Sequence, residues 1–411
     1  MKAVEQGSCW TVSDSMTLVR DYGKAVEDTP VAVELLPIDG SFNLEEAWKD
    51  LEARADGSFF LSWYWLGPWL KHLPPDAAPH ALVVRRAAQI VGLAVLCRRS
   101  IRRYGILRTP SWLLHETGDP LFDGLTVEYN GILADRSCAD RVTAESLLWM
   151  ARNLPGSDAL VLAGLGAREE ALVRGVASAL GYRLQVRRAD AARLVDLELV
   201  RQRGGKYRAG LGRSTRAGVN RAIRLYEARG GIEYRVAMDV DEALEFFDGL
   251  ERLHRAVWEA RGKAGSFANP AFRPLHRDLI RHGMDAGVVR LCRLTAGGQE
   301  FGYLYNFVWR GRVFNYQSGF AYEDDNRIKP GLVSHVLAIE DALARGENCY
   351  DFMAGSAGHK AHLANAQTPM NWITMSPDRF SSRLEAGLHR IELSLKQWRR
   401  RMKAPVANTT S

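Results

Sequence analysis

The sequence has no run of about eighteen consecutive apolar residues, the length that a membrane-spanning helix needs. Its longest apolar candidate, Ala81 to Cys97, is interrupted by Arg85 and Arg86. The segment Met1 to Cys9 also lacks the apolar core of a secretion signal. The sequence therefore predicts a protein without a transmembrane segment, and we expect it in the cytoplasm.

Cysteine is scarce, and several catalytic signatures are missing. The five cysteines are scattered, with no Cys-x-x-Cys pair, which argues against a disulfide framework and against a zinc site. The chain has neither Gly-x-Ser-x-Gly nor His-Glu-x-x-His. The run Gly164-Leu165-Gly166 lacks the third glycine of a dinucleotide fingerprint. These absences disfavour hydrolase and metal chemistry, and they also disfavour NAD-dependent oxidoreduction.

Positive charge is concentrated in one segment. The formal net charge is +7, yet residues 201–229 alone contain nine basic residues and one acidic residue, which leaves the rest of the chain near −1. A helix in this segment carries Arg213, Arg216, Asn220, Arg221 and Arg224, several at helical i, i+3 or i+4 spacing. The segment is either a solvated helix that bridges two domains or a surface that attracts phosphate or an acidic acceptor.

The length of 411 residues, 46% of them hydrophobic, suits two domains. Predicted elements recur in the same order in both halves, and Asp158 to Gly164 parallels Asn348 to Gly355, which indicates a tandem duplication. The second half contains a three-strand meander joined at Gly297-Gly298 and at Arg310-Gly311-Arg312. The predicted units are a flexible N-terminus (1–30), an N-terminal domain (31–200), a basic linker and helix (201–230), a C-terminal domain (231–378), and a basic C-terminal helix and tail (379–411).

A basic strand-to-helix turn follows the meander. The strand-like run Val313 to Phe320 leads through Asn326 to Ser334 into a predicted helix that continues to Gly346. The first amides of a helix lack partners within it and carry the positive end of the dipole, so they bind phosphate well. Arg327 and Lys329 add positive charge. We therefore expect this turn to hold the pyrophosphate of a phosphorylated cofactor.

Three motifs resemble the GNAT acyltransferase superfamily, in particular its tandem-domain branch with CelD-like proteins and Fem-type aminoacyltransferases. They are Lys329-Pro330-Gly331, then Tyr350-Asp351-Phe352-Met353-Ala354-Gly355, then His359-Lys360, with His359 where the family usually has tyrosine. The resemblance covers residues 31–376 and implies an α/β (α+β) fold of two tandem domains, each a mixed, largely antiparallel sheet flanked by helices. It also implies acyl transfer from acetyl-CoA or another acyl-CoA, in the C-terminal domain, without a metal.

The resemblance directs attention to two groups of site residues. The expected donor-binding residues are Phe320, Asn326, Arg327, Lys329, Gly331, Leu332, Val333 and Ser334. The expected catalytic residues are Tyr316, Glu323, Asp351, His359 and Lys360.

Each catalytic candidate has a chemical role and a structural alternative. Glu323, or a chain of waters, is the expected base near the third meander strand, and Tyr316 is the weaker candidate because a strand tyrosine is most often a packing residue. His359 or His362 would protonate the departing thiolate, and Lys360 would stabilise an oxyanion or hold an anionic acceptor. The structural alternative for Glu323 and for the two histidines is a solvated surface position, and Asp351 is expected to pair with Lys360 or an arginine.

Two further segments bear on partners. The aromatic run Phe59 to Leu70 is predicted to lie in the core, with an exposed subset able to line an acceptor cleft. The basic amphipathic helix Phe380 to Met402 either packs on the second domain or contacts anionic lipid.

The sequence thus predicts an acyltransferase that acts on an amine or hydroxyl of a small molecule or of a cell-envelope or polysaccharide precursor. One alternative is a Fem-type transferase that uses aminoacyl-tRNA and binds it through residues 201–229. Another is a non-catalytic scaffold in polysaccharide biosynthesis. Nucleic acid other than tRNA is not an expected partner, because aromatic residues are sparse in the basic segment.

Overall fold

The computed structural model describes residues 30–103, 107–125, 127–156, 159–355 and 358–379, with residues 383, 384, 387 and 388. The predicted flexible N-terminus and nearly all of the predicted basic C-terminal helix lie outside these residues. In the part of the chain that is described, no helix combines the length and apolar character needed to cross a membrane.

The N-terminal half runs from β1 to β7. Its strands are β1 (Val31–Pro37), β2 (His80–Arg86), β3 (Gln89–Arg103), β4 (Leu107–Leu114), β5 (Leu133–Ala134), β6 (Ala159–Leu165) and β7 (Tyr182–Asp196). Its helices are α2 (Leu44–Arg54), α3 (Trp63–Lys71), α4 (Ala139–Asn153) and α5 (Ala167–Leu180), with short 3-10 turns at Phe59–Leu61 and Phe122–Leu125.

The C-terminal half runs from α6 to β13. Its strands are β8 (Ile232–Val236), β9 (Val289–Ala296), β10 (Gln299–Trp309), β11 (Arg312–Phe320), β12 (Cys349–Ala354) and β13 (Ala366–Pro377). Its helices are α6 (Leu197–Gln202), α7 (Arg213–Glu227), α8 (Val240–Ala260), α9 (Phe272–Gly283), α10 (Pro330–Ala344) and α11 (Gly358–Leu363), with 3-10 turns at Tyr207–Gly210 and Ser266–Ala268.

The two halves repeat one order of elements, which confirms the predicted tandem fold. Leaving out the two-residue β5, the first half reads β1-α2-α3-β2-β3-β4-α4-β6-α5-β7, and from β8 the second reads β8-α8-α9-β9-β10-β11-α10-β12-α11-β13. In both halves the fourth strand of this series pairs in parallel with the fifth: β4 with β6, and β11 with β12. All other strand pairs in the sheet are antiparallel.

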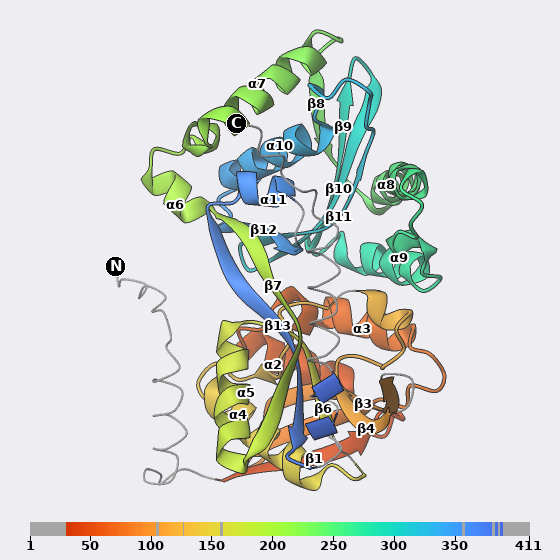
Figure 1. Cartoon of the computed structure of the whole chain (residues 1–411), viewed down its shortest axis with the longest axis vertical. Coiled ribbons are helices and arrows are strands. Elements are labelled where there is room, and N and C mark those ends of the chain that lie inside the picture. Colours follow the sequence, from red (N-terminus) through yellow and green to blue (C-terminus); the bar gives the residue numbers. More distant parts are fainter. Residues whose placement is uncertain are drawn as a thin grey trace, which may run out of the picture.

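The halves also exchange their last strands, so that one sheet of 13 strands runs through the molecule (Figure 1). β13, from the end of the second half, lies between β6 and β7 of the first half. In return, β7 lies between β12 and β13. The β7–β13 register extends from Tyr182 opposite Pro377 to Leu194 opposite Ala366. Each half therefore depends on the other to complete its sheet, and the boundaries between the two units stay a prediction.

The predicted meander is present, and its turn chemistry explains its tight connections. Gly297 and Gly298, between β9 and β10, both have positive φ angles, of 56° and 79°. Arg310 and Gly311, between β10 and β11, have φ angles of 50° and 76°. Two-residue hairpins whose twist matches the strands need this left-handed backbone, which glycine adopts at little cost.

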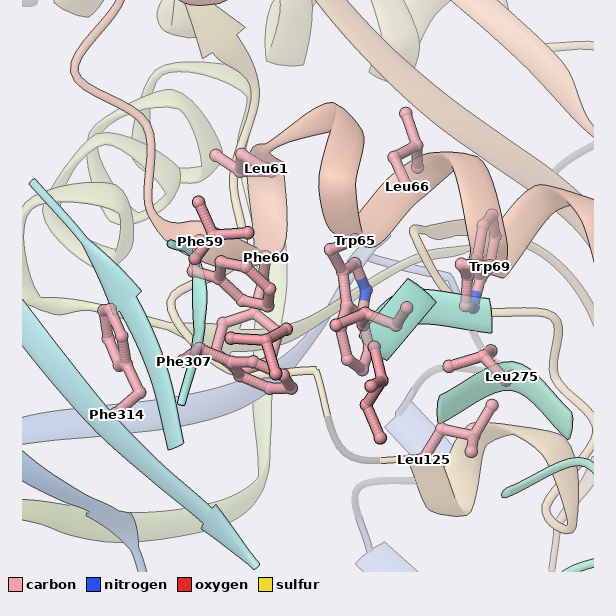
Figure 2. Packing of buried hydrophobic residues seen from close by; sticks show 14 of the residues in the cluster. Phe59, Phe60, Leu61, Trp65, Leu66, Trp69, Leu125, Leu275, Phe307 and Phe314 are labelled. Carbon is pink, nitrogen blue, oxygen red and sulfur yellow. The ribbon is translucent and has the colours of Figure 1, made fainter. Parts of the chain in front are cut away.

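Aromatic side chains join the halves on one face of the sheet. Phe59 of the first half stacks on Phe307 of β10, with ring centroids 4.1 Å apart, and Phe60 and Trp65 contact the same ring edge-on (Figure 2). All four are at most 1% exposed. The prediction that the aromatic run lies in the core is confirmed for Phe59, Phe60 and Trp65.

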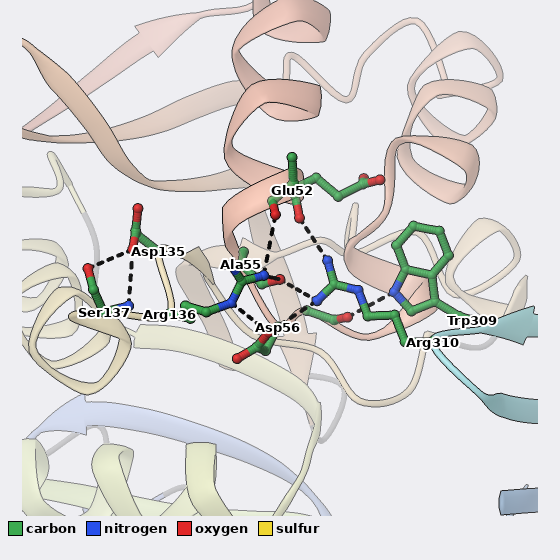
Figure 3. Close-up of polar contacts among 10 residues, drawn as sticks. Glu52, Ala55, Asp56, Asp135, Arg136, Ser137, Trp309 and Arg310 are labelled. Atoms are coloured by element: carbon green, nitrogen blue, oxygen red, sulfur yellow. Dashed lines mark hydrogen bonds and ion pairs between the residues drawn. The ribbon is translucent and has the colours of Figure 1, made fainter. Parts of the chain in front are cut away.

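Arg310 adds a polar contact between the halves. Its guanidinium lies at the end of α2, where it donates to the carbonyl of Glu52 at 2.7 Å and to the carbonyl of Ala55 (Figure 3). The neighbouring Trp309 donates its indole N–H to the carbonyl of Gly57 at 3.0 Å. These bonds satisfy carbonyls at the end of a helix, which otherwise lack partners.

Replacing Phe307 by alanine should destabilise both halves together. The substitution removes a fully buried ring that contacts the first half, and such changes cost about 3–5 kcal/mol. Because the sheet is continuous, we expect denaturant unfolding followed by far-ultraviolet circular dichroism to keep one transition, shifted to lower denaturant. Met238→Ala, at a side chain 81% exposed, is the control and should leave the midpoint unchanged. Two separated transitions in the Phe307 variant would contradict this coupling.

Candidate functional site

The cleft of the C-terminal half is created where two parallel strands separate. β11 and β12 pair over only three positions, from Arg312 opposite Cys349 to Phe314 opposite Asp351. Beyond them the strands part, and a pocket of about 380 Å³ opens. The described residues that line it are Glu128, His254, Val257, Trp258, Arg261, Ser266, Phe272, Asn315, Tyr316, Gln317, Ser318, Phe320, Tyr322, His335, Phe352, Met353, Ala354 and Lys360.

A β-bulge turns one wall of this pocket. Tyr305 of β10 faces Gln317, whereas Asn306 faces Asn315, so Tyr316 is the extra residue of β11. A bulge leaves the extra residue outside the ladder and re-aims its side chain. The Tyr316 hydroxyl donates to the carbonyl of Leu125, in the N-terminal half. Burial raises the pKa of Tyr316, so this phenol is a hydrogen-bond donor and not a base at neutral pH.

The predicted phosphate turn leads into α10. Lys329 precedes the helix without a side-chain cap, and Pro330 has no N–H. The amide of Val333 already donates to the carbonyl of Lys329 at 3.1 Å, whereas the amides of Gly331 and Leu332 have no partner among the described residues. These two amides are therefore the donors that the turn offers to a phosphate.

The other residues expected to bind the acyl-CoA donor differ in solvent exposure. Asn326, Arg327 and Lys329 are exposed, and Arg327 pairs with Asp325 at 2.7 Å. Val333 and Ser334 are fully buried in α10. Phe320 lines the pocket and lies against Gly331, whose added Cβ would be 3.1 Å from the ring.

Asp351 is buried behind the pocket and is held by groups from three segments. Its Oδ2 accepts the Tyr129 hydroxyl at 2.5 Å and lies 3.2 Å from Arg312 Nη2, while its Oδ1 accepts the amide of Met353 at 2.6 Å. Burial raises the pKa of Asp351, and Arg312 acts in the opposite direction. Asp351 is 0% exposed and is not among the described residues that line the pocket, so it contributes by positioning β12.

Two charged groups meet at the end of β12. Lys360 Nζ donates to the carbonyls of Phe352 at 2.7 Å and of Ala354 at 3.0 Å. Glu128, from the loop before β5, accepts the amide of Ala354 at 2.7 Å. Burial lowers the pKa of Lys360 and raises that of Glu128 to about 7. The pocket thus holds the partly buried ammonium of Lys360 beside the buried carboxyl group of Glu128, whose pKa is raised to about 7 by burial.

The remaining expected residues lie elsewhere. Glu323 is on the surface, where it forms two hydrogen bonds with Arg229, at 2.7 and 2.9 Å, and this pairing lowers its pKa. A lowered pKa makes a carboxylate a weaker base. His359 belongs to α11, but its side chain is outside the described part. His362 is exposed and lines a separate pocket beside the start of α7.

Sequence reasoning missed Glu128 and Tyr129. They belong to residues 115–132, a long connection without helical or strand periodicity, and they meet β12 more than 220 residues further along the chain. Met353 and Tyr129 have positive φ angles, of 60° and 53°. Such strained backbone persists only where the surroundings impose it, and it collects at functional sites.

Comparison with known families matches residues 213–361 to a model described as an acetyltransferase (GNAT) domain. This match includes β11, the predicted phosphate turn, β12 and Lys360, and it confirms the predicted resemblance to the GNAT superfamily. An acyltransferase is the class of enzyme that it supports. A search of curated proteins returned no match.

Solved structures with the same fold are distant in sequence. The chain superposes on FemX with a TM-score of 0.55 and 10% identity, over 82% of this chain and 96% of that one. A conserved protein of unknown function from Bacteroides thetaiotaomicron gives 0.51 and 13%, over 80% and 97%. The C-terminal domain of a protein described as a lysylphosphatidylglycerol synthetase, from Agrobacterium fabrum, gives 0.50 and 10%, over 85% and 95%. At these identities the comparisons establish the fold alone.

Replacing Tyr129 by phenylalanine should destabilise the protein by about 1–3 kcal/mol, because the buried carboxylate of Asp351 loses a donor. Equilibrium unfolding in urea measures this difference. Tyr322→Phe, at a side chain 57% exposed, is the matched control. Equal free energies of unfolding for the two variants would contradict the importance of the Tyr129–Asp351 bond.

Proposed function

We propose that this protein transfers an acyl group from acetyl-CoA or another acyl-CoA to an amine or hydroxyl. The proposal starts from the match of its C-terminal half to a GNAT acetyltransferase domain. The observation that carries the proposal is the separation of β11 from β12 beside the uncapped start of α10. An opening between strands suits an extended thioester arm, and unpaired helix amides suit its pyrophosphate.

The residues fit such a donor chemically. The amides of Gly331 and Leu332, with the exposed cations Arg327 and Lys329, are the groups that would bind the pyrophosphate. The wall opposite α10 comes from α8, α9 and the turn before α9, and it presents Trp258, Phe272 and Ser266 to an acceptor. Donor and acceptor would then meet near Glu128 and Lys360.

Lys360 contributes positive charge at this meeting point. Its ammonium donates to the carbonyls of Phe352, Met353 and Ala354, at 2.7, 3.4 and 3.0 Å. Its position fixes the end of β12, and its charge favours negative charge that develops on a thioester oxygen. The departing thiolate, with a reference pKa of about 8.5, is released more easily in the same field.

The acceptor class is proposed more broadly, as a small molecule or a cell-envelope or polysaccharide precursor in the cytoplasm. A panel of an amino sugar, an amino acid and a polyamine samples the amine and hydroxyl acceptors that this chemistry admits.

A second candidate is supported by the surface of α7. Arg213, Arg221 and Arg224 are exposed and have no acidic partner among the described residues. Such a surface suits the phosphates of a tRNA, as a Fem-type aminoacyl-tRNA donor would require. Retention on tRNA that falls steeply with salt would favour this donor over acyl-CoA.

Exchanging both Arg327 and Lys329 for glutamate should weaken acetyl-CoA binding at least about tenfold, since each charged hydrogen bond contributes about 1.5–3 kcal/mol. Isothermal titration calorimetry measures the affinity. Arg221→Glu with Arg224→Glu changes the net charge equally on α7 and should leave that affinity intact while weakening any tRNA binding. Unchanged affinity in the Arg327 and Lys329 variant would remove the phosphate turn from the proposal.

A further inference from the structure

The N-terminal half places one carboxyl group in the cleft of the C-terminal half. Glu128 is 2% exposed and lines the pocket together with Tyr316 and Lys360. One of its oxygens, Oε2, accepts the amide of Ala354 at 2.7 Å. The other oxygen has no hydrogen-bond partner among the described residues, so it is available to a molecule in the pocket.

Several contacts fix the backbone on which Glu128 lies. The amide of Asn130 donates to the carbonyl of Gly164 at 3.0 Å, and the Asn130 side chain accepts from His115 Nδ1 at 2.8 Å. Gly164 has a φ angle of 60°, and a Cβ there would lie 2.6 Å from the carbonyl oxygen of Val127. Only glycine allows this loop to approach β6 so closely. The carboxyl group is therefore held on rigid structure, as a group that acts on a substrate must be.

Glu128 is also the only carboxyl group among the described lining residues. Of the two histidines there, burial lowers the pKa of His254 to about 4, which leaves a weak base. The other, His335, is hydrogen-bonded through Nδ1 to the Tyr350 hydroxyl at 3.1 Å. Glu323 lies outside the pocket in its pair with Arg229.

We propose that Glu128 is the general base of this acyltransferase, supplied to the acyl-CoA cleft of one half by a loop of the other. The inference rests on the proposed function. The nitrogen or oxygen of the acceptor attacks the thioester carbonyl carbon, and the bond from that carbon to sulfur breaks. The proton of the nucleophile passes to Glu128, which later returns it to solvent, and the CoA thiolate takes up a proton from solvent.

The charges around Glu128 suit this role. Burial raises the pKa of Glu128 most, and Asp351 on β12 raises it further. The pKa is lowered by the amide of Ala354, by Lys360 on α11 and by Arg188 on β7. Tyr316 faces it from β11 as a neutral phenol. With a resulting pKa of about 7, the group is a stronger base than an ordinary carboxylate and is still deprotonated in part at neutral pH. The rate should therefore rise with pH and level off above about 7.

The test replaces Glu128 by glutamine, which keeps the size of the side chain and an oxygen for the amide of Ala354. The rate at which acetyl-CoA releases its CoA thiol, with water or a member of the acceptor panel taking the acetyl group, should fall roughly 10²–10⁴-fold. The dissociation constant for acetyl-CoA should change less than about threefold, because the phosphate turn is untouched. The rise of the remaining rate with pH should disappear.

Glu116→Gln is the matched control. Glu116 lies in the same connection, and burial raises its pKa to about 7 as well, but it pairs with Arg187 at 3.7 Å and does not line the pocket. This variant should keep the wild-type rate within about twofold, as expected for a change outside the cleft. Wild-type rates in Glu128→Gln would overturn the role of Glu128 and leave the proposed function standing. If the wild-type protein bound no acetyl-CoA, the proposed function would fail and this role with it.

A second measurement does not depend on turnover. The folded state raises the pKa of Glu128 from 4.5 to about 7, so ionisation favours the unfolded chain, and stability is lost as pH rises through this range. Glutamine does not ionise. The melting temperature of Glu128→Gln relative to wild type should therefore increase between pH 5 and pH 8. A difference that stays constant with pH would show that Glu128 does not ionise in this range and would overturn its role as the base.

Discussion

The exchange of β7 and β13 between the halves is the constraint on which the cleft depends. β12 has β11 on one side for only three residue pairs and β7 on the other. Because β7 holds the far edge of β12, β12 can part from β11 without leaving the sheet. Strand separation of this kind leaves backbone groups without ladder partners, and a buried backbone group without a partner is costly.

Side chains satisfy the backbone groups that the separation frees. Lys360 donates to the carbonyls of Phe352 and Ala354, Glu128 accepts the amide of Ala354, and Asp351 accepts the amide of Met353. The same charged groups that keep β12 in place therefore supply the charges of the pocket. This double use gives a physical reason for placing the partly buried ammonium of Lys360 beside a buried carboxyl group, since either charge would be destabilised there without the other.

Local features of the fold followed from the sequence, and distant contacts did not. The turn at Gly297-Gly298 and the buried aromatic run at Phe59 were predictable, because glycine pairs and aromatic clusters have local physical causes. The turn was predicted from its charge to bind phosphate, but which of its amides are unpaired depends on Pro330 and on the bond from Val333 to Lys329. Glu128 carries no signal in its own segment, since its place is set by Gly164 on β6 and by Ala354 on β12.

The exchanged strands also bear on the order in which the chain acquires its structure during synthesis. Domains commonly fold in sequence as they leave the ribosome, the N-terminal one first. Here the sheet of the first half has a gap between β6 and β7 that only β13, residues 366–377, fills. A nascent chain synthesised only as far as β7 still lacks the strand that joins β7 to β6. The first half must therefore wait, with the edges of β6 and β7 unpaired, until residue 377 has been synthesised, and it is exposed to chaperones and to misassembly during that time.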